Sequence, residues 1–306
     1  MKIKYANTSN CRICLQLSLP VEMMIRFAKL VNPDYDFYKR LGIKEDTPVF
    51  NQKAAECIVS DIVQDGYYVD FVETLVRVDR EGYMCRRYDL KGLSNVVASL
   101  VKEGYIFDKI SGQFIENHKE NITPGWGRLK EGEERKMALL RLDIAGNSAL
   151  VKSNSRIKIE QAYKDIRNIF YSTVNSRLGR IWSWEGDGAL AAFLFGSMEK
   201  MAVFAGMEVL QEIYFYNRLR NPLDSPINVR LGAHIGQIWY SDSEMERLKN
   251  ETVNQAIVYE ALAGNNTLCI SYNLYIDMDQ LILEHFGAEK TGRGCKYRLY
   301  KIGIEK

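Results

Sequence analysis

The sequence predicts an α+β protein: a mixed domain of strands and helices over residues 137–306, preceded by a small helical module over residues 1–117. Apolar residues recur at helical spacing in the first third of the chain. A polar segment with three glycines and a proline follows at 118–136. After it, apolar runs of strand length alternate with longer amphipathic ones. We therefore expect two domains joined by a linker at 118–136.

The composition is that of an ordinary globular protein of 306 residues, with 46% hydrophobic residues and a formal net charge of +2. This balance does not by itself indicate a nucleic-acid or membrane partner. The apolar runs are too short to span a membrane, and the first residues hold no apolar signal core, so we expect a cytoplasmic protein. Cys11 and Cys14 lack the two further ligands of a zinc site, and we interpret them as reduced thiols.

Three amphipathic helices are expected in the first module. The first begins at Pro20, which suits a first helical turn because it has no amide hydrogen, and it stops at Asn32. The second spans about 52–63, and the third spans 89–102 with Gly104 as its cap.

A β-hairpin is expected after the third helix, because alternating apolar residues flank a Ser-Gly pair at 111–112. Helices followed by a hairpin suggest a winged-helix-like domain over 45–117. It would either bind DNA through Arg86, Arg87 and Lys91 or serve as a protein-binding or sensory module. We favour the second interpretation, without a nucleic-acid partner, because the third helix carries only one basic residue before its C-terminal end.

The elements of the second domain follow one another without internal repeats. Strands are expected at 138–143, 179–184, 189–195, 229–240, 267–272 and 295–304. Helices are expected across 150–176, from Ser197 to Asn217, at 250–263 and at 277–285.

Two isolated acids end apolar runs in this domain. Asp143 follows ALLRL, and Asp187 lies in Gly-Asp-Gly, the shape of a hairpin tip. If the two strands are neighbours, both carboxylates fall on one rim, where they suit Mg²⁺ or Mn²⁺. The small-residue turn after Asp143 leads into a helix and would expose backbone amides to anionic oxygens. Each acid taken alone is equally well explained as a turn residue.

Four segments in order resemble the catalytic domain of class III nucleotidyl cyclases, the adenylate and guanylate cyclase fold. LRLDIAGNSALV and RIWSWEGDGALAAF resemble the two metal motifs of that family. INVRLGAHIGQIWY resembles the strand that ends Gly-Ile-His-Thr-Gly, and ETVNQAIVYEALAG resembles the helix whose Val-Asn pair lines the ribose and triphosphate. The last strands also match, so the resemblance covers residues 137–303. It implies a ferredoxin-like domain that cyclises a nucleoside triphosphate.

The resemblance also implies residue roles. Asp143, Asp187 and the carbonyl of Ile144 would hold two Mn²⁺ or Mg²⁺ ions. One ion lowers the pKa of the 3′-hydroxyl that attacks the α-phosphorus, and the other gathers the phosphates as pyrophosphate leaves. The residues expected at the triphosphate and the ribose are Asn147, Ser148 and Asn254.

Two departures from the family concern the base. Ser183 stands where purine cyclases have lysine or glutamate, and Arg247 stands where adenylate cyclases often have aspartate. Arginine can only donate hydrogen bonds, so it suits a base edge rich in carbonyls, such as that of uracil or guanine. Trp182 or Trp184 would cap the base pocket if it faced that pocket, although strand alternation also allows both to be core residues.

A third departure concerns the arginine that stabilises the transition state in the family. Val258 occupies its position. Losing one such donor typically costs about 3–4 kcal/mol. The candidates to replace it are Arg180, Arg293 and Lys296.

The phrase LRLDIAGNS, preceded by PGWGRLKEGEE, also resembles the bacterial pyrimidine cyclases of Pycsar antiviral defence systems. This implies a uridylate or cytidylate cyclase that makes cyclic UMP or cyclic CMP, with UTP favoured over CTP because of Arg247. It further implies a homodimer with shared sites, in which Ser183, Arg247 and Asn254 complete the site of the partner. The alternative is a cyclase-fold regulator without turnover that senses nucleotides or binds DNA.

Overall fold

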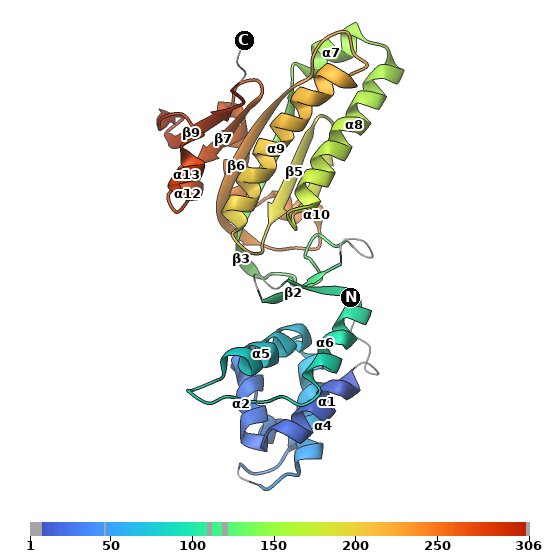
Figure 1. Ribbon diagram of the computed structural model, residues 1–306, viewed down its shortest axis with the longest axis vertical. Helices are drawn as coiled ribbons and strands as arrows, with labels where there is room; N and C mark the ends of the chain where they lie inside the picture. Colours follow the sequence, from blue (N-terminus) through green and yellow to red (C-terminus); the bar gives the residue numbers. More distant parts are fainter. Residues whose placement is uncertain (1–7, 46, 109–111, 118–121, 304–306) are drawn as a thin grey trace. The chain divides into compact units, whose positions relative to one another are not determined.

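The computed structural model describes residues 8–45, 47–108, 112–117 and 122–303 (Figure 1). The chain forms two compact units, Met1–Ile122 and Thr123–Lys306. The first is helical and the second contains a mixed sheet with helices, which confirms the predicted α+β class and the helical N-terminal module.

The first unit contains six helices and one hairpin among its described residues. The elements are α1 (Ser9–Ser18), α2 (Val21–Val31), α3 (Phe37–Leu41), α4 (Asn51–Gln64), α5 (Tyr68–Glu81), α6 (Leu93–Lys102), β1 (Tyr105–Asp108) and β2 (Gln113–Glu116). Helices α2 and α4 match the predicted ranges closely. The hairpin pairs antiparallel as predicted, although its tip at 109–111 lies outside the described residues.

Two parts of the first unit differ from the sequence expectations. Helix α6 begins at Leu93 rather than near Asp89, because Gly92 adopts φ +78, a left-handed conformation that interrupts a helix. Helices α1, α3 and α5 were not predicted. Their buried residues join one core with α2, α4 and α6, so tertiary packing stabilises them. Cys11 and Cys14 are free thiols buried in that core.

The second unit is built on a seven-stranded sheet in the order β4-β5-β3-β6-β7-β9-β8. Its elements are β3 (Glu134–Ala145), α7 (Asn147–Ser153), α8 (Arg156–Asn175), β4 (Arg180–Glu185), β5 (Gly188–Phe193), α9 (Met198–Leu219), β6 (Asn228–Trp239), α10 (Glu244–Leu248), α11 (Glu251–Leu262), β7 (Thr267–Ser271), α12 (Tyr272–Tyr275), α13 (Gln280–Leu283), β8 (Lys290–Gly292) and β9 (Cys295–Lys301). The four antiparallel strands β4-β5-β3-β6, with crossover helices after β3 and β5, form a ferredoxin-like core. The predicted strands and long helices of this unit are present. The helix expected at 277–285 is shortened to α13, and the short helix α12 precedes it.

The two faces of the sheet have different neighbours. On one face, Leu140, Leu142 and Ile144 of β3 join a core with α8 and α9, which lie side by side (Figure 1). The alternate residues of β3, including Asp143, point to the opposite face. Helix α11 packs there, where Gly232 of β6 leaves room for its backbone. Asp143 therefore lies on the face opposite the main core, and Asp187 lies in the turn between β4 and β5.

The segment from Thr123 to Glu133, expected to belong to a linker, packs within the second unit. Trp126 is fully buried and donates from its indole N–H to the carbonyl of Leu178 at 2.6 Å. Trp182 donates to the carbonyl of Pro124 at 3.0 Å, and Arg180 Nε donates to that of Thr123 at 3.2 Å. This segment therefore lines the edge strand β4.

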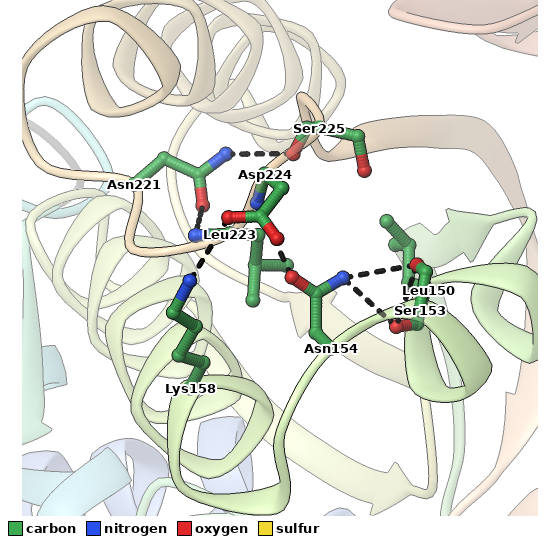
Figure 2. A network of polar contacts seen from close by, with 8 residues as sticks. All are labelled: Leu150, Ser153, Asn154, Lys158, Asn221, Leu223, Asp224 and Ser225. Carbon is green, nitrogen blue, oxygen red and sulfur yellow. Dashed lines mark hydrogen bonds and ion pairs between the residues drawn. The ribbon is translucent and has the colours of Figure 1, made fainter.

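Figure 2 shows a polar network that ties the end of α7 to the loop between α9 and β6. Asn154 donates from Nδ2 to the carbonyl of Leu150 at 3.0 Å, and its Oδ1 accepts from the backbone N–H of Asp224 at 3.2 Å. The Nζ atom of Lys158 lies 2.9 Å from Asp224 Oδ1. Because α7 begins at Asn147, this network helps to fix the residues that follow Asp143.

Candidate active site

Asp143 and Asp187 lie on one rim of the sheet. Strands β3 and β5 are neighbours, and Asp143 pairs with Gly188, the residue that directly follows Asp187. The backbone N–H of Ile144 donates to the carbonyl of Asp187 at 3.2 Å. Gly186, with φ +58, supplies the left-handed residue that this tight hairpin requires. The chain thus brings together two carboxylates that are 44 residues apart in sequence.

An arginine that the sequence analysis did not single out is bound to the first acid. Arg230 Nη2 of β6 lies 2.5 Å from Asp143 Oδ2, and its Nε lies 2.9 Å from Glu260 Oε1 of α11. The hydrogen bond to Asp143 is the largest of the effects that raise the pKa of Arg230, and the charges of Glu260 and Asp187 add to it. Burial, followed by the charge of Asp143, raises the pKa of Glu260. The rim is therefore a compact ionic cluster.

Asn147 begins α7 directly beside this cluster. The hydroxyl of Tyr163 on α8 donates to Asn147 Oδ1. Burial raises the pKa of Tyr163, and the charge of Asp187 raises it further, which places Tyr163 in the field of the second acid. Ser148 is exposed on the first turn of α7. The structure thus brings Asn147 close to the acids, whereas a role for Asn147 and Ser148 in binding the triphosphate stays a prediction.

The two residues predicted to select the base are both buried. Ser183 lies on β4, and Arg247 Nη1 donates to the carbonyls of Ser241 at 2.7 Å and Asp242 at 2.9 Å. The guanidinium of Arg247 lies 5.7 Å from the ring centroid of Trp182, the neighbour of Ser183. The structure therefore places Arg247 against Trp182, the residue before Ser183, and the roles of Ser183 and Arg247 stay predictions.

Trp182 and Trp184 face different surroundings. Trp184 packs on α8, with its ring centroid 5.9 Å from that of Phe170 and 4.9 Å from the guanidinium carbon of Arg167. Trp182 instead lies against the guanidinium of Arg247 and donates to the carbonyl of Pro124. Of the two tryptophans, Trp182 is thus the one that lies against Arg247.

The remaining predicted residues lie on different elements. Arg180 is buried and donates to the carbonyls of Thr123 and Gly179. Lys296 Nζ lies 3.1 Å from Glu289 on the surface. Asn254 is exposed on α11 and donates to Glu251. Their proposed catalytic roles stay predictions.

The donor set at the rim fits a hard divalent cation. It consists of the carboxylates of Asp143 and Asp187 and the nearby carbonyl of Ile144, all of them oxygen ligands of the kind that Mg²⁺ and Mn²⁺ prefer. In the described part of the chain, no cluster of three or more His, Cys, Asp or Glu residues is suited to holding a metal. Water and substrate oxygens would therefore have to complete the coordination of any ion bound here. Within the described residues, no helix is both long and apolar enough for a membrane span.

His234 of β6 is a buried base on the same face of the sheet. Its ring stacks on Tyr259 of α11 at 5.3 Å between centroids, and burial lowers its pKa to about 4, although the charge of Glu251 partly offsets this effect. Its ordinary pKa is 6.5. Between these pH values the unfolded chain binds a proton that the folded chain does not. The stability of the folded state is therefore unaffected by His234 above pH 6.5 and falls as the pH decreases toward 4.

Lowering the pH from 7 to 5 is therefore expected to remove about 2 kcal/mol of unfolding free energy through His234 alone. Denaturant unfolding at both pH values, with wild type and His234→Phe, measures this contribution. Phenylalanine keeps a ring against Tyr259 but cannot titrate. An equal loss of stability in the two proteins would contradict the assignment.

No family model matches the sequence, and no curated protein is similar to it. Among solved structures, the chain is similar to the guanylyl cyclase domain of a RhoGC fusion protein from Blastocladiella emersonii, with 14% identity over 56% of this chain and 97% of that one, at a TM-score of 0.46. It is also similar to an adenylate/guanylate cyclase/hydrolase from Silicibacter pomeroyi, with 23% identity over 56% and 99%, at 0.46. A third is the adenylyl cyclase CyaB from P. aeruginosa, with 16% identity over 56% and 96%, at 0.47. At this level of similarity the matches determine neither the substrate nor the reaction of this chain.

Proposed function

We propose that this chain is a metal-dependent nucleotidyl cyclase that converts a nucleoside triphosphate to its 3′,5′-cyclic monophosphate and pyrophosphate. The observation that carries the proposal is the pairing of Asp143 with Gly188, which sets Asp143 and Asp187 on one rim of a ferredoxin-like sheet. The order of the motif segments along the chain supports the same reaction.

The residues of the rim have distinct proposed tasks. Asp143, Asp187 and the carbonyl of Ile144 would hold two Mn²⁺ or Mg²⁺ ions, which supply charge neutralisation and a more acidic 3′-hydroxyl. Arg230 orients the carboxylate of Asp143 through its contact of 2.5 Å. With Asp143 shared with bound cations, the guanidinium of Arg230 would be free to donate to a phosphate oxygen, its other usual partner.

We extend the proposal to the base and favour a pyrimidine, UTP before CTP. Arg247 offers only donors, and its buried Nε has no hydrogen-bond partner among the described residues. Trp182 lies beside it and adds a flat apolar surface. These features suit a small base with carbonyl oxygens. An antiviral role in bacteria rests only on the resemblance of LRLDIAGNS and its preceding segment to the Pycsar cyclases.

We also propose a homodimer with sites shared between subunits. Asn254 is exposed on α11, whereas the acids that it would complement lie on β3 and in the turn between β4 and β5. In a twofold pair, Asp143 and Asp187 of one subunit would face Ser183, Arg247 and Asn254 of the other, which gives two equivalent sites.

Incubation with ATP, GTP, CTP and UTP separately, each with Mn²⁺ or Mg²⁺, tests the proposed function. Separation of the products by mass is expected to show cyclic UMP, or cyclic CMP as the second choice. Formation of cyclic AMP or cyclic GMP would contradict the proposed base specificity but would still support the cyclase reaction. No cyclic product from any nucleotide, with the protein folded, would favour the regulator without turnover.

A further inference from the structure

An arginine on β3 lies beside the candidate site and belongs to none of the roles described above. Arg141 stands two residues before Asp143, so both side chains point to the same face of the sheet. Its pairing partners are Leu190 on β5 and Gly232 on β6. It is half-buried, in the third strand of a seven-stranded sheet.

The guanidinium of Arg141 reaches along the strand to the level of Asp143. A Cβ atom built on Gly188 would lie 3.2 Å from Arg141 Nη2, so the guanidinium lies over the bare backbone of that glycine. Gly188 is the pairing partner of Asp143 and directly follows Asp187. Arg141 thus flanks Asp143 on the β5 side, while Arg230 flanks it on the β6 side.

One donor of this guanidinium is not satisfied by the described residues. Its Nε is buried and lacks a hydrogen-bond partner within the described residues. The acid whose pKa responds to its charge is Glu260, and Glu260 already lies 2.9 Å from Arg230. A buried donor without a partner destabilises the folded protein, so a residue of this kind in a candidate site is suited to a ligand acceptor.

With cations bound to the aspartates, the charges at the rim would favour an anionic ligand. Arg141 and Arg230 supply two positive charges against the negative charges of Asp143, Asp187 and Glu260. If cations bind the two aspartates, less negative charge remains to balance the two guanidinium groups. A polyanion with several acceptor oxygens would restore it.

We propose that Arg141 is a substrate-binding residue that donates from its guanidinium to an acceptor oxygen of the nucleotide, either a phosphate oxygen or a base carbonyl. This rests on the proposed function, since it concerns the same site. Arginine matches both acceptors because its planar fork of donors can hold two oxygens at once.

The variant Arg141→Gln removes the charge and keeps a polar chain of similar length. Arg156→Gln is the matched control, because Arg156 lies exposed on α8 and pairs with Glu160. Binding of inorganic tripolyphosphate in the presence of Mn²⁺ is measured by calorimetry. A phosphate contact predicts a rise in Kd of roughly 10- to 100-fold for Arg141→Gln and none for the control.

A contact to the base gives a different result. Tripolyphosphate binding would stay unchanged, while kcat/KM for the preferred nucleotide would fall roughly 10- to 100-fold and the other nucleotides would change little. In Gly188→Ala the new Cβ would press on Arg141 Nη2. This variant is expected to change whichever quantity Arg141→Gln changes, the Kd for tripolyphosphate or kcat/KM, in the same direction. Arg141→Lys keeps the charge and is expected to restore part of the binding.

The proposal is overturned if Arg141→Gln, folded as judged by circular dichroism, binds tripolyphosphate and discriminates among nucleotides as wild type does. If Arg141→Gln does not fold, Arg141→Lys and Gly188→Ala decide by the same two measurements. If the wild-type protein binds tripolyphosphate through Arg141 but forms no cyclic product, the proposed cyclase reaction is refuted and the role of Arg141 stands. A wild-type protein that binds neither tripolyphosphate nor any nucleotide would refute both.

Discussion

Replacing Asp143 or Asp187 by asparagine is expected to lower the rate of cyclic nucleotide formation by about 10³-fold or more. Each carboxylate would hold cations that stabilise charge in the transition state by several kcal/mol, and about 4 kcal/mol corresponds to 10³ in rate. Asparagine keeps the shape of the side chain and removes the charge. The rate is measured by mass separation of the products with the preferred nucleotide and Mn²⁺.

Asp224→Asn is the matched control for the two aspartates, because Asp224 is an exposed acid whose surface ion pair with Lys158 is worth at most about 1 kcal/mol. The pair of Asp143 with Arg230 is also partly exposed, so Asp143→Asn is expected to remain folded. In a dimer with shared sites, mixing Asp143→Asn with Asn254→Ala restores one complete site in each mixed pair. A folded Asp143→Asn or Asp187→Asn protein with more than a tenth of wild-type activity would refute the metal assignment.

Replacing Gly232 by alanine is expected to destabilise the second unit by at least about 3 kcal/mol. The new Cβ would lie 2.2 Å from the backbone nitrogen of Glu260 and 2.7 Å from the carbonyl oxygen of Ala256. Both are backbone atoms of α11, so no side chain can yield and the helix must move off the sheet. Denaturant unfolding, followed by circular dichroism, measures the loss.

Gly264→Ala is the matched control, since the nearest atom to its Cβ would be Thr267 Oγ1 at 3.6 Å, an ordinary contact. Its stability is expected to stay within about 0.5 kcal/mol of wild type. Because α11 carries Asn254 and Glu260, the Gly232 variant is also expected to lose activity before it unfolds completely. Wild-type stability in Gly232→Ala would contradict the close approach of α11 to β6.

The strands and long helices of the second unit could be predicted because each has a regular apolar period. The two acids could be found because each is isolated at the end of an apolar run. Helix α5 was not predicted, since its start, YVDFV, is rich in aromatic and β-branched residues that also suit a strand. The burial of residues such as Phe71 and Leu75 in the core of the first unit stabilises the helix instead.

The partners of the acids could not be predicted in the same way. Arg230 lies 87 residues after Asp143, and their contact depends on the register between β3 and β6. A shift of one residue would send Arg230 to the opposite face. The same holds for Arg141, whose position over Gly188 depends on the pairing of β3 with β5. The types of side chain are visible in the sequence, but their meeting follows from the assembled sheet.

The segment that begins at Thr123 determines where a force on the preceding chain would act on the second unit. The carbonyls of Thr123 and Pro124 are held by Arg180 and Trp182, both on the edge strand β4. A pull or a twist applied to the chain just before Thr123 is therefore borne first by an edge strand with one neighbour, next to Ser183. The central strand β3 begins only at Glu134, eleven residues further along the chain.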